Sequence, residues 1–287
     1  MSAPAGDDTV GSLLAAARRA LAAAPADTAP REAALLLGHL LGLDEARLRA
    51  RAERRVDRAT AAAYRELVGR RAVGEPVAYL LGRREFYGRD FLVDARVLVP
   101  RPETEHLVEV ALALELPPRP RIVDVGAGSG CIAVTLACEL EAARVLASDV
   151  SLGALAVTLA NARRLGVADR VACVAADGAR AFDLAAVDLL VSNPPYIAPE
   201  VAESLPLDVS AHEPHEALFA ADAGRSVLAA LLAAATDLRP GVHLLLEIGH
   251  DQADWLRAKV ASQPALELVE LVRDYGGHER TAVVRRG

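Results

Sequence analysis

Apolar residues recur every three or four positions through the first quarter of the chain, which is the spacing of one face of a helix. In the first such segment, Leu13, Ala17 and Leu21 fall on one stripe, and Pro30 suits the first turn of the second. The pattern predicts helices over residues 12–24, 31–43 and 59–74. Short amphipathic helices bury their apolar faces against one another, so we expect a small helical bundle.

The periodicity changes in residues 76–100. Aromatic residues flank Gly88-Arg89-Asp90, with Phe86 and Tyr87 before it and Phe91 after it. Strand-like runs on both sides of a glycine-containing turn are typical of a β-hairpin. We expect a hairpin here that connects the helical bundle to the rest of the chain.

From about residue 102 onward, apolar strand-like runs alternate with helical segments. The strand-like runs cover residues 121–126, 144–150, 170–177, 187–193, 242–249, 266–273 and 280–285. The helical segments cover residues 129–141, 151–165, 224–237 and 251–262. Strands that alternate with helices predict a mostly parallel sheet covered on both faces. The last two runs predict an antiparallel hairpin at the edge of that sheet.

Together these patterns predict an α/β protein in three parts. They are a helical bundle over residues 1–75, a β-hairpin linker over residues 76–100, and a Rossmann-like domain with a seven-stranded sheet over residues 101–287. In a doubly wound sheet the fourth strand lies beside the first, and ligands bind at the carboxyl ends of the strands.

Composition and net charge limit the classes of partner that we expect for this protein. Of the 287 residues, 53% are hydrophobic and 25% are charged, which fits a soluble globular protein. The net charge of −7 argues against strong nonspecific binding to nucleic acid, because that affinity comes mostly from neutralising phosphates. Six arginines between Arg47 and Arg58 make a local basic stretch, which we interpret as a solvated helix face.

Cysteine usage and the absence of a targeting pattern indicate a compartment. Cys131, Cys138 and Cys173 form no CxxC pair and are typical of small buried residues in a reducing environment. The N-terminus lacks the pattern of a signal peptide, and no apolar run reaches roughly 18 residues. We therefore expect a cytoplasmic protein without a membrane partner.

A glycine-rich loop, Asp124-Val-Gly-Ala-Gly-Ser-Gly130, closes the first predicted strand and opens the next helix. Glycines allow a tight turn and a close approach of the backbone to a ligand. The dinucleotide fingerprint is GxGxxG, whereas the third glycine here comes one position earlier. We infer that the loop binds a nucleoside without a pyrophosphate. The candidate cofactor-binding residues in it are Gly126, Ala127, Gly128, Ser129 and Gly130.

Acidic residues end the second and third predicted strands. Asp149 comes about 20 residues after the glycine loop, where a carboxylate accepts both ribose hydroxyls. Asp177, followed by Gly178, is placed to hold the exocyclic amine of an adenine. Acids at strand ends also cap the following helix, but the glycine loop upstream favours the ligand interpretation.

The fourth predicted strand ends in Asn193-Pro194-Pro195-Tyr196, where two prolines exclude a regular helix or an inner strand. If the cofactor is S-adenosylmethionine, the methyl acceptor must be oriented, because the lone pair of a planar nitrogen is delocalised. The Asn193 side-chain oxygen and the Pro194 carbonyl oxygen accept its two N–H groups and stabilise the developing positive charge. Tyr196 offers a flat face to a planar group. These four residues are the catalytic candidates.

The tetrapeptide leaves alternatives open. Asn193 is also a common turn former after a strand. The planar nitrogen suits adenine N6, guanine N2 or glutamine N5, and the tetrapeptide does not choose among them. A nucleic-acid methyltransferase is disfavoured by the acidic balance. A cofactor-binding protein without activity is disfavoured by the intact Asn193 and Asp149.

Longer stretches of the chain resemble one family of class I methyltransferases. The stretches are GEPVAYLLGRREFYGRDFLVDARVLVPRPETE (74–105), HEPHEALFAADAG (212–224), LLLEIG (244–249) and RDYGGHERTAVVRR (273–286). They resemble the protein-(glutamine-N5) methyltransferases of peptide chain release factors, the PrmC/HemK type. The segment VLVPRPETE (97–105) is especially characteristic, because the ribosomal-protein glutamine methyltransferases usually differ after VPR. The resemblance covers nearly the whole chain and is weakest over residues 1–60.

This resemblance implies a cytoplasmic enzyme of translation termination. It implies that S-adenosylmethionine donates a methyl group to N5 of the glutamine in the Gly-Gly-Gln loop of class I release factors. It also implies no metal and no direct nucleic-acid partner. By this similarity the loop from Gly126 to Gly130, Asp149, Gly178 and Asn193 contact the cofactor, and Asn193 to Tyr196 hold the substrate glutamine.

The resemblance assigns further roles with less detail. Arg101 and Glu103 are candidate substrate-binding residues, and with Glu105 they are expected near the mouth of the site, as a lid or as a structural clasp. Glu213-Pro214 is expected to brace the loop after the tetrapeptide. His212 departs from the family, where an aromatic or apolar residue is more usual. The helical bundle, residues 1–75, is the expected recognition surface for the release factor.

Overall fold

The computed structural model describes residues 5–21 and 28–287. Contacts between residues divide the chain into two units, Met1–Gly82 with Pro206–His212, and Arg83–Leu205 with Glu213–Gly287. The first division therefore falls at Gly82, between the two boundaries that we expected at residues 75 and 100. The described residues contain no helix with both the length and the apolar character needed to cross a membrane.

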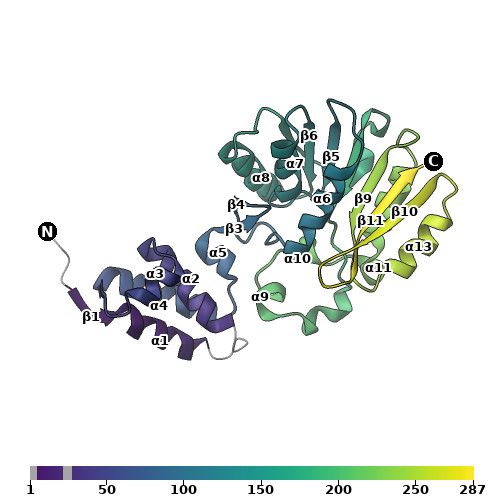
Figure 1. Ribbon diagram of the computed structural model, residues 1–287. Coiled ribbons are helices and arrows are strands. Elements are labelled where there is room, and N and C mark those ends of the chain that lie inside the picture. The colour runs from purple at the N-terminus through teal and green to yellow at the C-terminus, as the bar shows by residue number, and fades with distance from the viewer. Residues whose placement is uncertain (1–4, 22–27) are drawn as a thin grey trace. The chain divides into compact units, whose positions relative to one another are not determined.

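The first unit is the expected helical bundle (Figure 1). Its helices are α1 (Val10–Ala20), α2 (Thr28–Leu41), α3 (Glu45–Ala50), α4 (Arg58–Ala72) and α5 (Val77–Leu81). The short helix α9 (Leu207–Ser210) comes more than 100 residues later in the sequence but belongs to the same unit. The apolar stripes meet in one core, where Tyr64 also donates a hydrogen bond to the Ala33 carbonyl oxygen over 3.0 Å.

Side-chain caps explain where several of these helices begin. Thr9 and Ser12 form a capping box at the start of α1, and Asp57 accepts from the Thr60 N–H at the start of α4 over 2.9 Å. The helix predicted over residues 12–24 begins two residues earlier, and residues 22–24 of that prediction lie outside the described part of the chain.

Two features of this unit were not predicted from the hydrophobic pattern. Strand β1 (Ala5–Thr9) pairs antiparallel with β2 (Arg55–Asp57), a segment that we had interpreted as part of a solvated helix face. Helix α5 lies within the segment that we expected to be a hairpin linker, and it ends at Gly82 in the left-handed conformation. All three elements are five residues or shorter, which is too short for a helical or strand period to show.

The hairpin is present, but its turn is shorter than predicted. Strand β3 (Arg83–Phe86) pairs with β4 (Arg89–Leu92), and Phe86 lies opposite Arg89. The turn is Tyr87-Gly88, with φ of 51° and 71°, so Arg89 and Asp90 are strand residues and their assignment to the turn was wrong. Positive φ at both positions is the type I′ turn that matches the twist of two strands. The hairpin packs in the second unit through buried Phe86 and Phe91.

The second unit contains a seven-stranded sheet, as predicted. Its strands are β5 (Arg121–Val125), β6 (Arg144–Asp149), β7 (Val171–Ala175), β8 (Leu189–Ser192), β9 (His243–Glu247), β10 (Leu266–Arg273) and β11 (Glu279–Arg286). Their order across the sheet is β10-β11-β9-β8-β5-β6-β7. The five strands β5 to β9 are parallel, and β11 and β10 add an antiparallel edge. Strand β8 lies beside β5, as the doubly wound arrangement requires.

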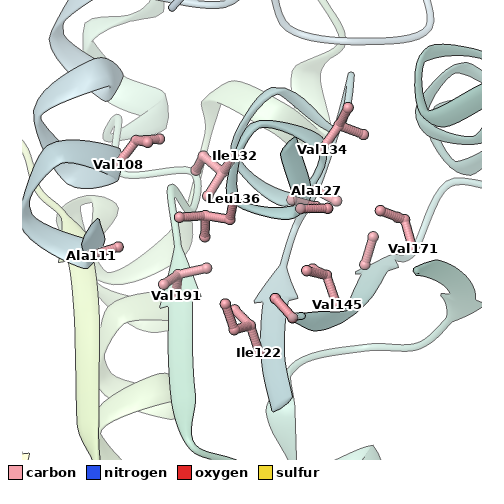
Figure 2. Close-up of a cluster of buried hydrophobic side chains, with 14 of the residues drawn as sticks. Val108, Ala111, Ile122, Ala127, Ile132, Val134, Leu136, Val145, Val171 and Val191 are labelled. Atoms are coloured by element: carbon pink, nitrogen blue, oxygen red, sulfur yellow. The ribbon is translucent and has the colours of Figure 1, made fainter. Parts of the chain in front are cut away.

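Helices cover both faces of this sheet (Figure 1). They are α6 (Glu105–Ala113), α7 (Cys131–Glu139), α8 (Leu152–Arg164), α12 (Ser226–Ala235) and α13 (Ala253–Ala261). The short helices α10 (His215–Leu218) and α11 (Ala221–Gly224) come between β8 and α12 in the sequence. Neighbouring residues of a strand point to opposite faces. Ile122 accordingly packs under α6 and α7, whereas Val123 packs against α12. Figure 2 shows the first of these two cores, with Ile132 and Leu136 of α7 above Ile122 and Val191.

Candidate cofactor and methyl-transfer site

A cavity of about 440 Å³ opens at the carboxyl ends of the parallel strands, where the topology predicts a ligand. Eight of the candidate residues line it: Gly126, Gly128, Asp149, Asp177, Gly178, Asn193, Pro194 and Pro195. Six candidates do not line it: Ala127, Ser129, Gly130, Tyr196, Arg101 and Glu103. Further lining residues were not predicted from the sequence, and they include Arg96, Val97 and Leu98 before the Pro-Arg-Pro-Glu segment and residues of α12.

The glycine loop presents its backbone to open space. A Cβ atom at Gly126 or Gly128 would meet no atom within 4 Å, although φ of 75° and 56° already favours glycine there. Gly130 serves packing instead, because a Cβ atom there would lie 2.8 Å from the Thr158 side chain. Asn161, which is fully buried in α8, donates to the Ser129 carbonyl oxygen over 2.9 Å and holds the loop from behind.

Asp149 is held by the same loop. Its Oδ2 accepts from the Gly128 N–H and its Oδ1 from the Ser151 N–H, each over 2.9 Å. The side-chain cap of α8 is Ser151, which accepts from the Ala154 N–H, so Asp149 is not needed for that purpose. A carboxylate has about four lone-pair positions, and two of them remain for a ligand.

Asp124 lies beneath the loop, at the end of β5, and is fully buried. Its Oδ2 accepts from the Ala133 N–H over 3.1 Å, whereas its Oδ1 has no partner in the described part of the chain. Burial raises the pKa of this carboxyl to about 7, and the hydrogen bond from Ala133 opposes the rise. Asp124 begins the glycine-rich motif, but no role was predicted for it from the sequence.

Contacts from distant segments clamp the backbone of the tetrapeptide. Ser192 donates to the Val125 carbonyl oxygen over 2.6 Å, which connects β8 to β5, the strand that precedes the glycine loop. The buried Gln252 side chain donates to the Tyr196 carbonyl oxygen over 3.0 Å. Gly224 approaches the same oxygen so closely that a Cβ atom there would lie 2.1 Å from it. The residues on either side of Asn193-Pro194-Pro195, which are Ser192 and Tyr196, are therefore contacted by three other segments of the chain.

A side-chain network holds the polar groups of the tetrapeptide. Asn193 Nδ2 donates to Thr104 Oγ1 over 3.0 Å, and Thr104 Oγ1 donates to Glu247 Oε2 over 2.6 Å. The Tyr196 hydroxyl donates to the other carboxylate oxygen, Oε1, over 3.1 Å. Burial raises the pKa of Glu247, and the bonds from Thr104 and Tyr196 oppose the rise. Tyr196, which we expected to present a flat face to the substrate, also uses its hydroxyl to hold Glu247.

The segment at the expected mouth of the site forms a clasp. Arg101 Nη2 lies 2.8 Å from both carboxylate oxygens of Glu213, whose side chain is 2% exposed. Glu105 accepts from the Tyr87 N–H in the hairpin turn over 3.0 Å, and Glu103 is exposed. The Arg101–Glu213 contact is of the kind expected of a clasp, and the roles predicted for Arg101 and Glu103 in substrate binding stay predictions. His212, which departs from the family pattern, belongs to the first unit, where it packs against Gly74.

The residues around the cavity fit S-adenosylmethionine. The open faces of Gly126 and Gly128 suit close approach by a ligand. Asp149 keeps two lone-pair positions for ribose hydroxyls, and Asp177 supplies a further acceptor at the cavity wall. Asp149 and Asp177 together make the cavity wall acidic, which suits a ligand that carries sulfonium and ammonium charges.

Two family models match the chain. The model of the PrmC N-terminal domain matches residues 12–82, and that of the methyltransferase small domain matches residues 104–207. Among solved structures, the catalytic domain of hMettl16 in complex with an RNA hairpin, MAT2A 3'UTR hairpin 6, has a TM-score of 0.55. It is 18% identical in sequence and covers 77% of this chain and 82% of that one, so the likeness concerns the fold alone. The fold is that of the class I methyltransferases, as predicted.

Curated relatives are similar in sequence to this chain along nearly its full length. The chain is 43% identical over 281 residues to the release factor glutamine methyltransferase of Nitratidesulfovibrio vulgaris, which covers 97% of this chain and 95% of that protein. It is 44% identical over 252 residues to the protein of the same name from Bordetella pertussis, which covers 87% and 92%. The cofactor of such an enzyme is S-adenosylmethionine, as predicted. The chain therefore belongs to the release factor glutamine methyltransferase family.

Proposed function

We propose that this enzyme methylates the side-chain amide nitrogen, N5, of the glutamine in the Gly-Gly-Gln loop of class I peptide chain release factors. The reaction takes place in the cytoplasm and needs neither a membrane nor a nucleic-acid partner. The observation that carries the proposal is the tetrapeptide at the cavity. Asn193 uses its Nδ2 for Thr104, and its Oδ1 has no hydrogen-bond partner among the described residues.

The chain's own residues orient the acceptor. Asn193 Oδ1 and the Pro194 carbonyl oxygen accept the two N–H groups of the substrate amide, and the prolines keep both acceptors in place without side-chain motion. These acceptors become more favourable as the nitrogen gains positive charge. When bound, S-adenosylmethionine supplies an electrophilic methyl group. The glycine loop, Asp149 and Asp177 bind that cofactor.

Two glycines before the substrate glutamine allow its backbone to approach the cavity without side-chain clash. The helical first unit then recognises the remainder of the release factor. We propose this role for residues 1–75 and expect the enzyme to methylate an intact release factor with a much higher kcat/KM than a short peptide that contains Gly-Gly-Gln. Equal kcat/KM values would contradict a recognition role for this unit.

A transfer assay tests the proposed reaction. The purified enzyme is incubated with radiolabelled S-adenosylmethionine and, in separate reactions, with a release factor, DNA or ribosomal RNA. We expect label on the release factor, and we expect it to disappear when the glutamine of Gly-Gly-Gln is replaced by alanine. Label on nucleic acid alone would contradict the proposal and favour a nucleic-acid amino-methyltransferase.

A further inference from the structure

The hydrogen bonds behind the tetrapeptide all have their donors directed toward Glu247, either directly or through Thr104. Thr104, at the end of the single-turn helix η1 (Pro102–Thr104), is 1% exposed, as is Glu247 at the end of β9. Glu247 accepts from two hydroxyl groups, those of Thr104 and Tyr196, over 2.6 and 3.1 Å. The Asn193 amide contacts the network at the Thr104 oxygen, over 3.0 Å. Three segments far apart in sequence, which contribute Thr104, the tetrapeptide and Glu247, therefore meet in this network.

The carboxylate determines which way the Asn193 amide faces. Each carboxylate oxygen of Glu247 accepts a hydrogen bond from a hydroxyl group, and a hydroxyl has one proton to donate. Thr104 commits that proton to Glu247, so its oxygen can only accept from its other neighbour. Asn193 must then turn its NH₂ group toward Thr104, and its carbonyl oxygen, Oδ1, is left for the substrate. A rotated amide would place NH₂ against the N–H groups of the substrate amide.

We propose that Thr104 and Glu247 are positioning residues that keep the acceptor oxygen of Asn193 directed at the methyl-accepting nitrogen. This role deepens the proposed function and rests on it, because an amide acceptor needs an oxygen rather than an NH₂ group at this position. An asparagine amide has nearly the same shape in its two orientations, so packing alone selects weakly between them. Hydrogen bonding selects strongly, because a mismatched pair leaves polar groups unsatisfied.

Thr104→Val and Thr104→Ser test this role as a matched pair. Valine has nearly the shape of threonine but lacks the hydroxyl, and serine keeps the hydroxyl. We expect Thr104→Val to lower kcat for release factor methylation about tenfold or more, with the Kd for S-adenosylhomocysteine within about twofold of the wild type. Thr104→Ser is expected to restore most of the kcat. A purely structural role would weaken cofactor binding and thermal stability in proportion to the lost activity.

Glu247→Gln provides a second test, should the valine variant fail to fold because it leaves a buried carboxylate with one partner fewer. Glutamine keeps the volume and can bond to both hydroxyls, but its NH₂ group can release the Thr104 proton toward Asn193. We expect kcat to fall about threefold to tenfold while cofactor affinity and the melting temperature stay close to the wild type. A folded Glu247→Gln enzyme with unchanged kcat would overturn the proposal.

A double variant separates positioning from other effects. If Thr104 acts through Asn193, then Thr104→Val should lower the residual activity of Asn193→Ala by less than twofold, whereas independent effects would multiply. Multiplication of the two losses would overturn the proposal. Wild-type enzyme in the same assay distinguishes failure of the proposed function from failure of the positioning role. A wild type that labels no release factor contradicts the proposed function, and a wild type that does, beside an equally active Thr104→Val variant, contradicts only the positioning role.

Discussion

The two halves of the cavity are built in different ways. The cofactor half includes Gly126 and Gly128 of the glycine loop, with Asp149 at the end of the next strand and Asp177 after the strand that follows. The acceptor half depends on side chains that arrive from far along the chain, since Thr104 is 89 residues from Asn193 and Gln252 is 56 residues from Tyr196. Backbone geometry therefore shapes one half, and tertiary hydrogen bonds shape the other. Variants in the two halves should fail in different kinetic parameters.

Asn193→Ala is expected to have the largest effect on turnover. It removes one of the two acceptors for the substrate amide, and loss of a preorganised group of this kind costs about 10²–10³ in kcat. Cofactor affinity should change little, because the glycine loop and Asp149 are intact. Single-turnover methylation and a titration with S-adenosylhomocysteine measure the two quantities. A near-normal kcat would remove the basis for the acceptor argument.

Gly224→Ala tests the backbone clamp on the acceptor half. The added Cβ would lie 2.1 Å from the Tyr196 carbonyl oxygen, so we expect a loss of about 3 kcal/mol or more in unfolding free energy, together with reduced kcat. Gly241→Ala is the matched control, because Gly241 has a similar φ of 85° and open space around it. The control should lose only about 1–2 kcal/mol from backbone strain. Equal losses in urea unfolding would show that the close contact with Tyr196 is unimportant.

Asp149→Asn is expected to produce the opposite kinetic pattern to Asn193→Ala. The charge that would bind the ribose hydroxyls is lost, and a hydrogen bond to a charged group contributes about 1.5–3 kcal/mol. The Kd for S-adenosylhomocysteine should therefore rise about 10-fold to 100-fold, whereas kcat at saturating cofactor should fall far less. Calorimetric titration and steady-state kinetics provide the two values. A fall in kcat with unchanged Kd would mean that the two halves are not separable.

Asp124→Asn should have the smallest effect, on stability rather than turnover. The folded-state pKa of Asp124 is raised from 3.8 to about 7, so the native state keeps a proton that the unfolded state loses, and this contribution to stability declines as pH rises from about 4 to 7. The variant lacks that decline. Its unfolding free energy relative to the wild type should therefore improve by about 2–3 kcal/mol between pH 5 and pH 8. A difference that does not vary with pH would contradict the raised pKa.

Local patterns predicted most of the fold. The helical stripes of the first unit and the alternation of strands and helices in the second are repeated signals, and each corresponds to an observed element. Short elements gave no such signal: β1, β2 and α5 are each five residues or fewer. The hairpin turn was placed one residue too late, because Tyr87 adopts a positive φ that an aromatic residue seldom shows.

The residues of the candidate site also differ in whether local sequence patterns predicted them. The glycine spacing and Asp149 were recognisable because neighbouring residues in sequence act together there. Thr104 and Glu247 stand in segments that the sequence analysis had quoted, PRPETE and LLLEIG, yet neither had an assigned role. Arg101 was expected to bind substrate or to form part of a lid or clasp; its contact with Glu213 was not predicted, and its role in substrate binding stays a prediction.

The sequence by itself determined the class of fold, the glycine loop and the diproline at the end of β8, since each depends on periodicity or on backbone restrictions of nearby residues. The tertiary structure decided which distant side chains stand behind that diproline. A hydrogen bond between residues 89 or 143 positions apart exists only after strands and helices have packed, and no local rule encodes its partner. Folding thus joins Asn193 to Thr104 and Glu247, and this contact directs the amide on which the proposed reaction depends.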